Sequence, residues 1–261
     1  MDVLGHIFEV MVGMFVSHEP KKEDFAQEEQ LGELVKIGYF YRVNNKYEEA
    51  VKYFKQALKI RKCSDVYNHL GIAYIKTEEY QKAVSTFHRA LDIDRGHFPA
   101  FYNMGIAFYH MGKYKLAEGS FAVAVGLDGL EARVKAGACN DRGGALERMY
   151  DFERAEASYK ASLALNEKHL SAYVNLGNLY CKQDKLDEAS VYYNKALELN
   201  DRCGSAYNGL GILASYKGDF EMAKKMFDKA LVVNKSSEAA HMNNRLLEAI
   251  IKSRECEKSH F

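Results

Sequence analysis

Apolar side chains recur at spacings of three and four residues along most of the chain, which is the pattern of helices with one buried face. Short polar stretches interrupt this pattern at regular intervals, for example Asn44-Asn45-Lys46, Lys76-Thr77-Glu78 and Lys217-Gly218-Asp219. Only 2 of the 261 residues are proline, a residue that breaks helix interiors. The pattern therefore predicts an all-α protein built from short helices that are joined by tight polar turns.

The helical pattern repeats itself. Successive glycines are separated by 33, 34, 38, 34 and 34 residues, and an alanine, an aromatic and a small residue follow each glycine at constant spacing. The alanine, the aromatic and the small residue of each set lie on one face of a helix, since residues four and seven apart are neighbours there. Small residues let a second helix approach, and the ring fills the gap beside them. The sets are Gly38, Gly71, Gly105, Gly143, Gly177 and Gly211; Ala50, Ala83, Ala117, Ala155, Ala189 and Ala223; Phe54, Phe87, Phe121, Tyr159, Tyr193 and Phe227; and Ala57, Ala90, Ala124, Ser162, Ala196 and Ala230.

The period of about 34 residues, with L-G-x-x-Y followed by A-x-x-x-F, resembles the tetratricopeptide repeat. The resemblance covers Leu31 to Ser237 and implies a right-handed superhelical solenoid of six helix–turn–helix repeats. Residues 1–30 would then form an N-terminal amphipathic helix and linker, and residues 238–261 a C-terminal capping helix and tail, as solenoids need for solubility. The expected repeats span 31–63, 64–97, 98–135, 136–169, 170–203 and 204–237.

The fourth repeat departs from the pattern. Cys139 replaces a large hydrophobic residue, Arg142 replaces leucine, and four extra residues lie within Gly126 to Gly137. We expect a lengthened helix or a loop there, and a weaker interface between the third and fourth repeats. That interface could act as a hinge, or the insertion could simply be accommodated at the surface.

The N-terminal segment has its own amphipathic pattern between Val3 and Val16. It is too short to span a membrane, and no positive charge precedes it as in a secretory signal. Such a helix could dock on its own solenoid, on a partner protein or second copy, or on a membrane surface, although its polar face lacks the Lys and Arg of interfacial helices. The candidate self-assembly residues are Leu4, Ile7, Phe8, Met11 and Phe15.

Charge and cysteine content narrow the function classes. Lys and Arg together number 36, as do Asp and Glu, so the chain has no basic excess for binding nucleic acid. The five cysteines form no C-x-x-C pair, which indicates neither a disulfide framework nor a zinc site. A reducing, cytoplasmic location is expected. No phosphate-binding loop, metalloprotease motif or nucleophile elbow occurs, so we expect no enzyme activity, no cofactor and no metal.

The resemblance also implies a binding surface, because the first helix of each tetratricopeptide repeat lines the concave face. Side-chain amides on this surface could hold an extended peptide, and its apolar groups suit an amphipathic helix. Some of these residues could instead pack within the superhelix. The Lys and Asn that co-chaperones of this family use to grip a terminal carboxylate are replaced by Val35 and Tyr39, which argues against that clamp. The expected groove residues are Val35, Tyr39, Arg42, Asn68, Ile72, Ile75, Tyr102, Ile106, Tyr109, Asn140, Val174, Asn178, Asn208 and Ile212.

A narrower resemblance rests on the run from His69 to Thr77, H-L-G-I-A-Y-I-K-T, which is similar to a stretch of the magnetosome-associated MamA family. That resemblance implies a homo-oligomeric coat, peripheral on an organelle membrane, in which an N-terminal segment engages a neighbour's groove. This chain has an extra repeat. The alternative is a monomeric adaptor for a foreign protein in a cellular assembly or regulatory pathway.

Overall fold

The computed structural model describes residues 22–258, and within that range every regular element is a helix. The all-α prediction is confirmed. Leu4, Ile7, Phe8, Met11 and Phe15 lie outside the described residues. The chain divides into two compact units, of which unit 1 ends at His97 and unit 2 begins at Phe98.

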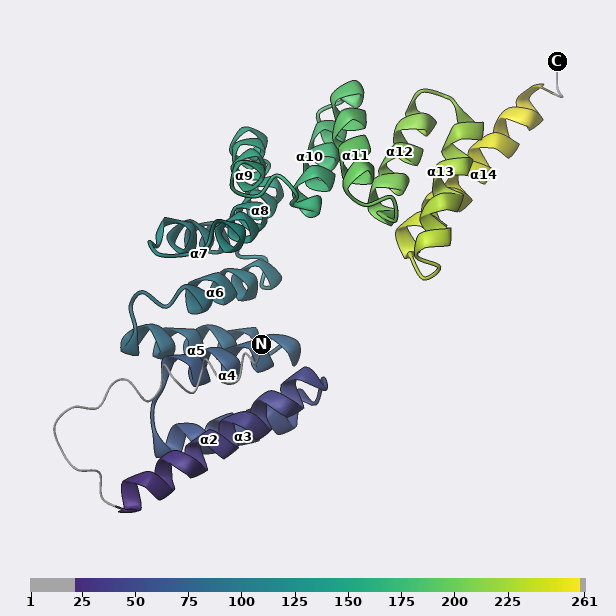
Figure 1. Cartoon of the computed structure of the whole chain (residues 1–261). Coiled ribbons are helices and arrows are strands. Elements are labelled where there is room, and N and C mark those ends of the chain that lie inside the picture. The colour runs from purple at the N-terminus through teal and green to yellow at the C-terminus, as the bar shows by residue number, and fades with distance from the viewer. Residues whose placement is uncertain (1–21, 259–261) are drawn as a thin grey trace. The chain divides into compact units, whose positions relative to one another are not determined.

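Within its described residues, unit 1 contains two helix pairs, α2 (Lys22–Val43) with α3 (Tyr47–Ile60), and α4 (Ser64–Lys76) with α5 (Tyr80–Ile93), drawn in purple and blue in Figure 1. The two helices of each pair pack on one another, and α3 also packs on α4. Helix α2 has 22 residues, whereas α4 has 13, because the polar stretch after residue 21 continues the helix.

Unit 2 contains four further pairs and one terminal helix, drawn from teal to yellow in Figure 1. Helix α14 (Glu238–Lys258) packs on α13 and buries Ala240 and Leu247. The pairs are α6 (Phe98–His110) with α7 (Tyr114–Gly126), α8 (Ala132–Arg148) with α9 (Phe152–Leu165), α10 (Leu170–Lys182) with α11 (Leu186–Leu199), and α12 (Gly204–Tyr216) with α13 (Phe220–Val233).

The repeated glycine and aromatic residue meet inside every pair. A Cβ built on Gly38 would lie 2.7 Å from a ring carbon of Phe54, and one on Gly71 would lie 2.4 Å from Phe87. The four pairs of unit 2 show the same contact, and all six rings are buried. The glycine therefore sets how closely the two helices approach.

Each pair is closed by a three-residue turn whose middle residue has a positive φ between 60° and 78°. Glycine adopts this left-handed conformation freely, whereas other residues do so at a cost in free energy. The six middle residues are Asn45, Glu78, Gly112, Tyr150, Asp184 and Gly218.

The fourth repeat contains the expected lengthened helix but not the expected weak interface. Helix α8 has 17 residues and begins at Ala132, four residues before the expected boundary. Arg142 donates from Nε and Nη2 to Oε1 of Glu118 on α7, at 2.8 and 2.6 Å. Among the described helices, α7 and α8 contact each other more extensively than any other helices that join neighbouring repeats. The expectation of a weaker interface was wrong, because the longer helix and the ion pair add contacts.

Candidate binding surfaces

The first helices of unit 1 carry six of the expected groove residues. Val35, Tyr39 and Arg42 lie on α2, and the remaining three lie on α4. Tyr39 has 43% of its surface exposed, whereas Asn68 is buried and the others are half-buried. The set defines the unit 1 surface: Val35, Tyr39, Arg42, Asn68, Ile72 and Ile75.

Tyr39 and Arg42 of this surface form a cation–aromatic cluster with the neighbouring His69. The Cζ atom of Arg42 lies 4.8 Å from the ring centroid of Tyr39, which is within the range of a cation–π contact. The ring of His69 meets Tyr39 edge-on at 6.0 Å and stacks on Phe54 at 5.8 Å. His69 was not among the expected groove residues, because nothing in its sequence position shows that it lies against a ring from the previous repeat.

The cluster contains two buried nitrogen atoms with no hydrogen-bond partner among the described residues, Nε of Arg42 and Nδ1 of His69. Burial, and then the nearby Arg42 charge, lower the pKa of His69 to about 4, so its imidazole is neutral at pH 7. The neighbouring Asp65 contacts His97 at 3.0 Å, which lowers the pKa of its carboxyl group. Because Nε itself is buried, a ligand's acceptor group would have to meet the Arg42 guanidinium through its other nitrogens, beside the exposed Tyr39 ring.

The first helices of unit 2 carry the other eight expected residues, defined here as the unit 2 surface. Asn140 and Val174 are buried, at 8% and 9% exposure, whereas Asn178 is exposed and the rest are half-buried. Tyr102, Ile106 and Tyr109 lie on α6, Asn140 on α8, Val174 and Asn178 on α10, and Asn208 and Ile212 on α12.

Polar side chains on this surface join neighbouring repeats. Asn175 Nδ2 donates to Oδ1 of Asn140 at 2.9 Å, and Asn243 Nδ2 donates to Oδ1 of Asn208 at the same distance. Between the third and fourth repeats, the Tyr102 hydroxyl donates to Oδ2 of Asp141 at 2.5 Å. Burial, followed by the Asp141 charge, raises the pKa of Tyr102. These groups therefore bond within the protein, which leaves fewer of them for a ligand.

A second arginine–tyrosine contact lies in unit 2. Arg148 Nη2 donates to the Tyr114 hydroxyl at 2.7 Å, and its Cζ lies 5.0 Å from the centre of that ring. Tyr109 meets Tyr114 edge-on at 5.3 Å. Burial raises the pKa of Tyr109, so its hydroxyl is protonated at neutral pH.

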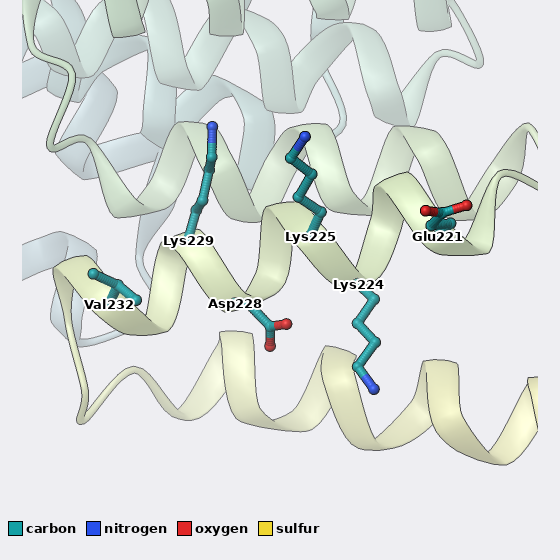
Figure 2. A pocket seen from close by; sticks show the side chains of 6 residues that line it. All are labelled: Glu221, Lys224, Lys225, Asp228, Lys229 and Val232. Atoms are coloured by element: carbon teal, nitrogen blue, oxygen red, sulfur yellow. The ribbon is translucent and has the colours of Figure 1, made fainter.

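A shallow hollow on α13 has a different character. In Figure 2, Lys225 and Lys229 extend to one side of the helix, and Lys224 and Asp228 to the other. Lys229 Nζ lies 5.2 Å from the centre of the Tyr207 ring, and Asp228 accepts from Asn244 Nδ2 at 3.4 Å. These charges diverge instead of converging on one point, so the hollow offers no built site. Between residues 22 and 258, no helix combines the length and apolar character that crossing a membrane requires.

The helices are paired in tandem, and in every pair a buried aromatic ring packs against the repeat glycine. This arrangement defines a helical repeat protein, a class used for protein interaction. The tetratricopeptide repeat models match residues 34–62, 64–97 and 168–236. The chain belongs to the tetratricopeptide repeat family.

One curated relative is human tetratricopeptide repeat protein 6, which is 28% identical over 179 residues, 56% of this chain and 34% of that protein. The chain thus spans about a third or less of the length of the first curated relatives it matches. Pseudomonas aeruginosa PilF has a similar fold, with a TM-score of 0.71 at 19% identity over 86% of this chain and 99% of that one.

Two further solved structures share the fold. MamA matches with a TM-score of 0.55 at 23% identity, covering 64% of this chain and 95% of that one. YrrB, described as a repeat protein with an unusual peptide-binding site, matches with a TM-score of 0.54 at 21% identity, covering 74% and 97%. At these identities the likeness concerns the fold.

Proposed function

We propose that this chain is a non-catalytic scaffold that binds a peptide or a helical segment of another protein on its first-helix surfaces. The observation that carries the proposal is the Tyr39–Arg42–His69 cluster, in which an exposed ring and two buried nitrogens without described partners lie together. Proteins rarely leave buried polar atoms unpaired without a reason.

The chemistry of the cluster favours a ligand with an acidic side chain. Arg42 supplies a positive charge, and Tyr39 supplies an exposed ring. The half-buried Ile72 and Ile75 on α4 add apolar surface for a neighbouring side chain of the same ligand. An acidic residue followed by an apolar one therefore matches this surface.

A random peptide library selected against the full chain tests the proposal. Selected peptides should be enriched in Asp or Glu, and Arg42→Met should weaken their binding at least tenfold in fluorescence anisotropy. Lys59→Met, which removes an exposed charge from α3, is the matched control and should leave binding unchanged. Equal affinity in the two variants would contradict a role for this cluster.

Self-assembly into a coat, as the MamA resemblance implies, is the second candidate. It is supported by the fold likeness to MamA and by the apolar residues between Val3 and Val16. Such a coat would lie at the surface of an organelle membrane, and its subunits would use the same first-helix surfaces for one another. A monomeric adaptor for a foreign protein is the alternative.

Light scattering over a concentration series separates the two. A self-assembling chain should form large particles that disappear in the double variant Ile72→Asp, Ile106→Asp, while its helicity by circular dichroism stays unchanged. A chain that remains monomeric at all concentrations would leave the adaptor as the function. Particles that survive the double substitution would contradict assembly through the first-helix surfaces.

A further inference from the structure

One face of α2 differs from the same face of later first helices. The residue two positions after the repeat glycine is buried in α4, α10 and α12, with exposures of 0% for Ala73, 0% for Leu179 and 4% for Leu213. On α2 the equivalent residue is Phe40, which is 60% exposed, and Ile37, three residues earlier, is 38% exposed. An exposed face of this kind on a terminal repeat needs a cover.

In the later repeats the cover is the second helix of the preceding repeat. Helix α3 packs on α4, α9 on α10, and α11 on α12. No helix among residues 22–258 precedes α2. The exposed residues Ile37, Phe40 and Val43 follow one another at intervals of three along one side of α2, and we call them the α2 patch.

The segment immediately before α2 has the dimensions of the missing helix. Helices α3, α5, α9, α11 and α13 have 14 residues each, and the amphipathic pattern from Val3 to Val16 spans the same length. Between this pattern and α2 lie residues 17–21, a stretch of similar length to residues 94–97, 127–131 and 166–169 between later helices. The apolar positions of the pattern from Val3 to Val16 include Leu4, Phe8 and Phe15.

The segment is also long enough to reach the patch. At 1.5 Å per residue, Phe40 lies about 27 Å along the helix from Lys22. The five residues 17–21 span at most about 17 Å when extended. A helix as long as the pattern from Val3 to Val16 adds about 21 Å. A helix running antiparallel to α2 therefore passes over the patch. So short a connector gives the segment an effective concentration in the millimolar range, which favours its own chain over a second copy.

We propose that residues 3–16 form a helix that packs on the α2 patch of the same molecule, in the place that the second helix of the preceding repeat takes in the later repeats. At the other end, α14 occupies the position of a first helix and covers α13 in the same way. This inference does not depend on the proposed function. It places the segment within its own chain and leaves the first-helix surfaces free for another protein.

The absence of tryptophan from the sequence makes a direct test possible, because Phe8→Trp in the full chain introduces a single tryptophan. Its emission should be shifted to the blue and shielded from acrylamide, at every protein concentration. Adding Phe40→Lys should shift the emission to the red and increase quenching several-fold. Val232→Lys, at a position 77% exposed on α13, is the matched control and should change nothing.

Three results would overturn the inference. In the first, acrylamide quenches the tryptophan as freely as it quenches the free amino acid. In the second, light scattering finds a dimer, and the shielding is lost when dilution dissociates it. In the third, Phe40→Lys and Val232→Lys change the emission and quenching of the tryptophan equally. Circular dichroism checks that Phe40→Lys remains folded, and Phe40→Leu, which keeps the patch apolar, should preserve the shielding.

Discussion

Phe87 occupies the space that any side chain at Gly71 would need, since a Cβ at Gly71 would lie 2.4 Å from Cε1 of that ring. The ring is fully buried and belongs to the second helix of the same pair, so it has no free space into which to move. This relationship makes Gly71 a condition for the packing of α4 on α5.

Gly71→Ala should therefore lower the free energy of unfolding, although alanine favours helix more than glycine does. Overpacking typically costs 1–3 kcal/mol, and the gain in helix propensity is about 0.5–1 kcal/mol, so we expect a net loss of about 1–2 kcal/mol. Gly32→Ala is the control in the same unit, because nothing lies within 4 Å of a Cβ there. Urea unfolding should show that Gly32→Ala is neutral or stabilising; equal losses would contradict the argument.

Glu78→Gly should have the opposite effect. Glu78 is exposed and has a φ of 61°, a conformation that costs a non-glycine residue about 1–2 kcal/mol. Glycine adopts this conformation without strain but loses more entropy on folding. We therefore expect the free energy of unfolding, measured by heat or urea, to rise by about 1 kcal/mol. Gly218→Ala, at a φ of 78° in the equivalent turn of the last repeat, should lower the free energy of unfolding by a similar amount. A loss of stability in Glu78→Gly would show that the turn is not strained.

The buried imidazole of His69 should make the stability of unit 1 depend on pH. Its pKa is about 4 in the folded protein against 6.5 for a free histidine. The unfolded chain therefore takes up the proton first as the pH falls, and stability that is complete above pH 6.5 declines towards pH 4, by up to about 3 kcal/mol. An NMR titration should place the His69 midpoint below 5.

His69→Gln provides the control for this pH dependence, because glutamine does not titrate. The decline in unfolding free energy between pH 6.5 and pH 4 should become shallower in this variant. Burial also lowers the pKa of His169 in unit 2, so some decline remains in both proteins. An unchanged slope would show that His69 is accessible to protons in the folded state.

Removing Glu118 should destabilise unit 2 more than removing its partner Arg142. Glu118 Oε1 accepts from Arg142 and also from Arg154 Nη2 at 2.9 Å. Glu118→Ala leaves two guanidinium groups without this acceptor, at a cost of about 1–2 kcal/mol. Arg142→Leu restores the residue that is usual in this family, and Glu118 keeps its contact with Arg154, so we expect a change below about 1 kcal/mol. Urea unfolding that ranks the two variants in the reverse order would contradict this account.

The helices and the turns between them follow from the sequence alone. Helical periodicity and turn residues act over a few positions, so the turns at 44–46 and 217–219 lie where the polar stretches predict them, and the turn expected at 76–78 lies one residue later, at 77–79. The contact between Gly71 and Phe87 was also predictable, because its spacing recurs in all six repeats.

The environment of the groove residues depends on the tertiary structure. The carbonyl of Asn140 accepts from Asn175, His69 lies against Tyr39, and Arg142 reaches Glu118. Each of these contacts joins two repeats, and the periodic pattern says only which face of a helix is buried, not which side chain of the next repeat lies opposite. The sequence by itself therefore determined the repeated helix pair, whereas packing between repeats decided which polar groups are satisfied within the protein.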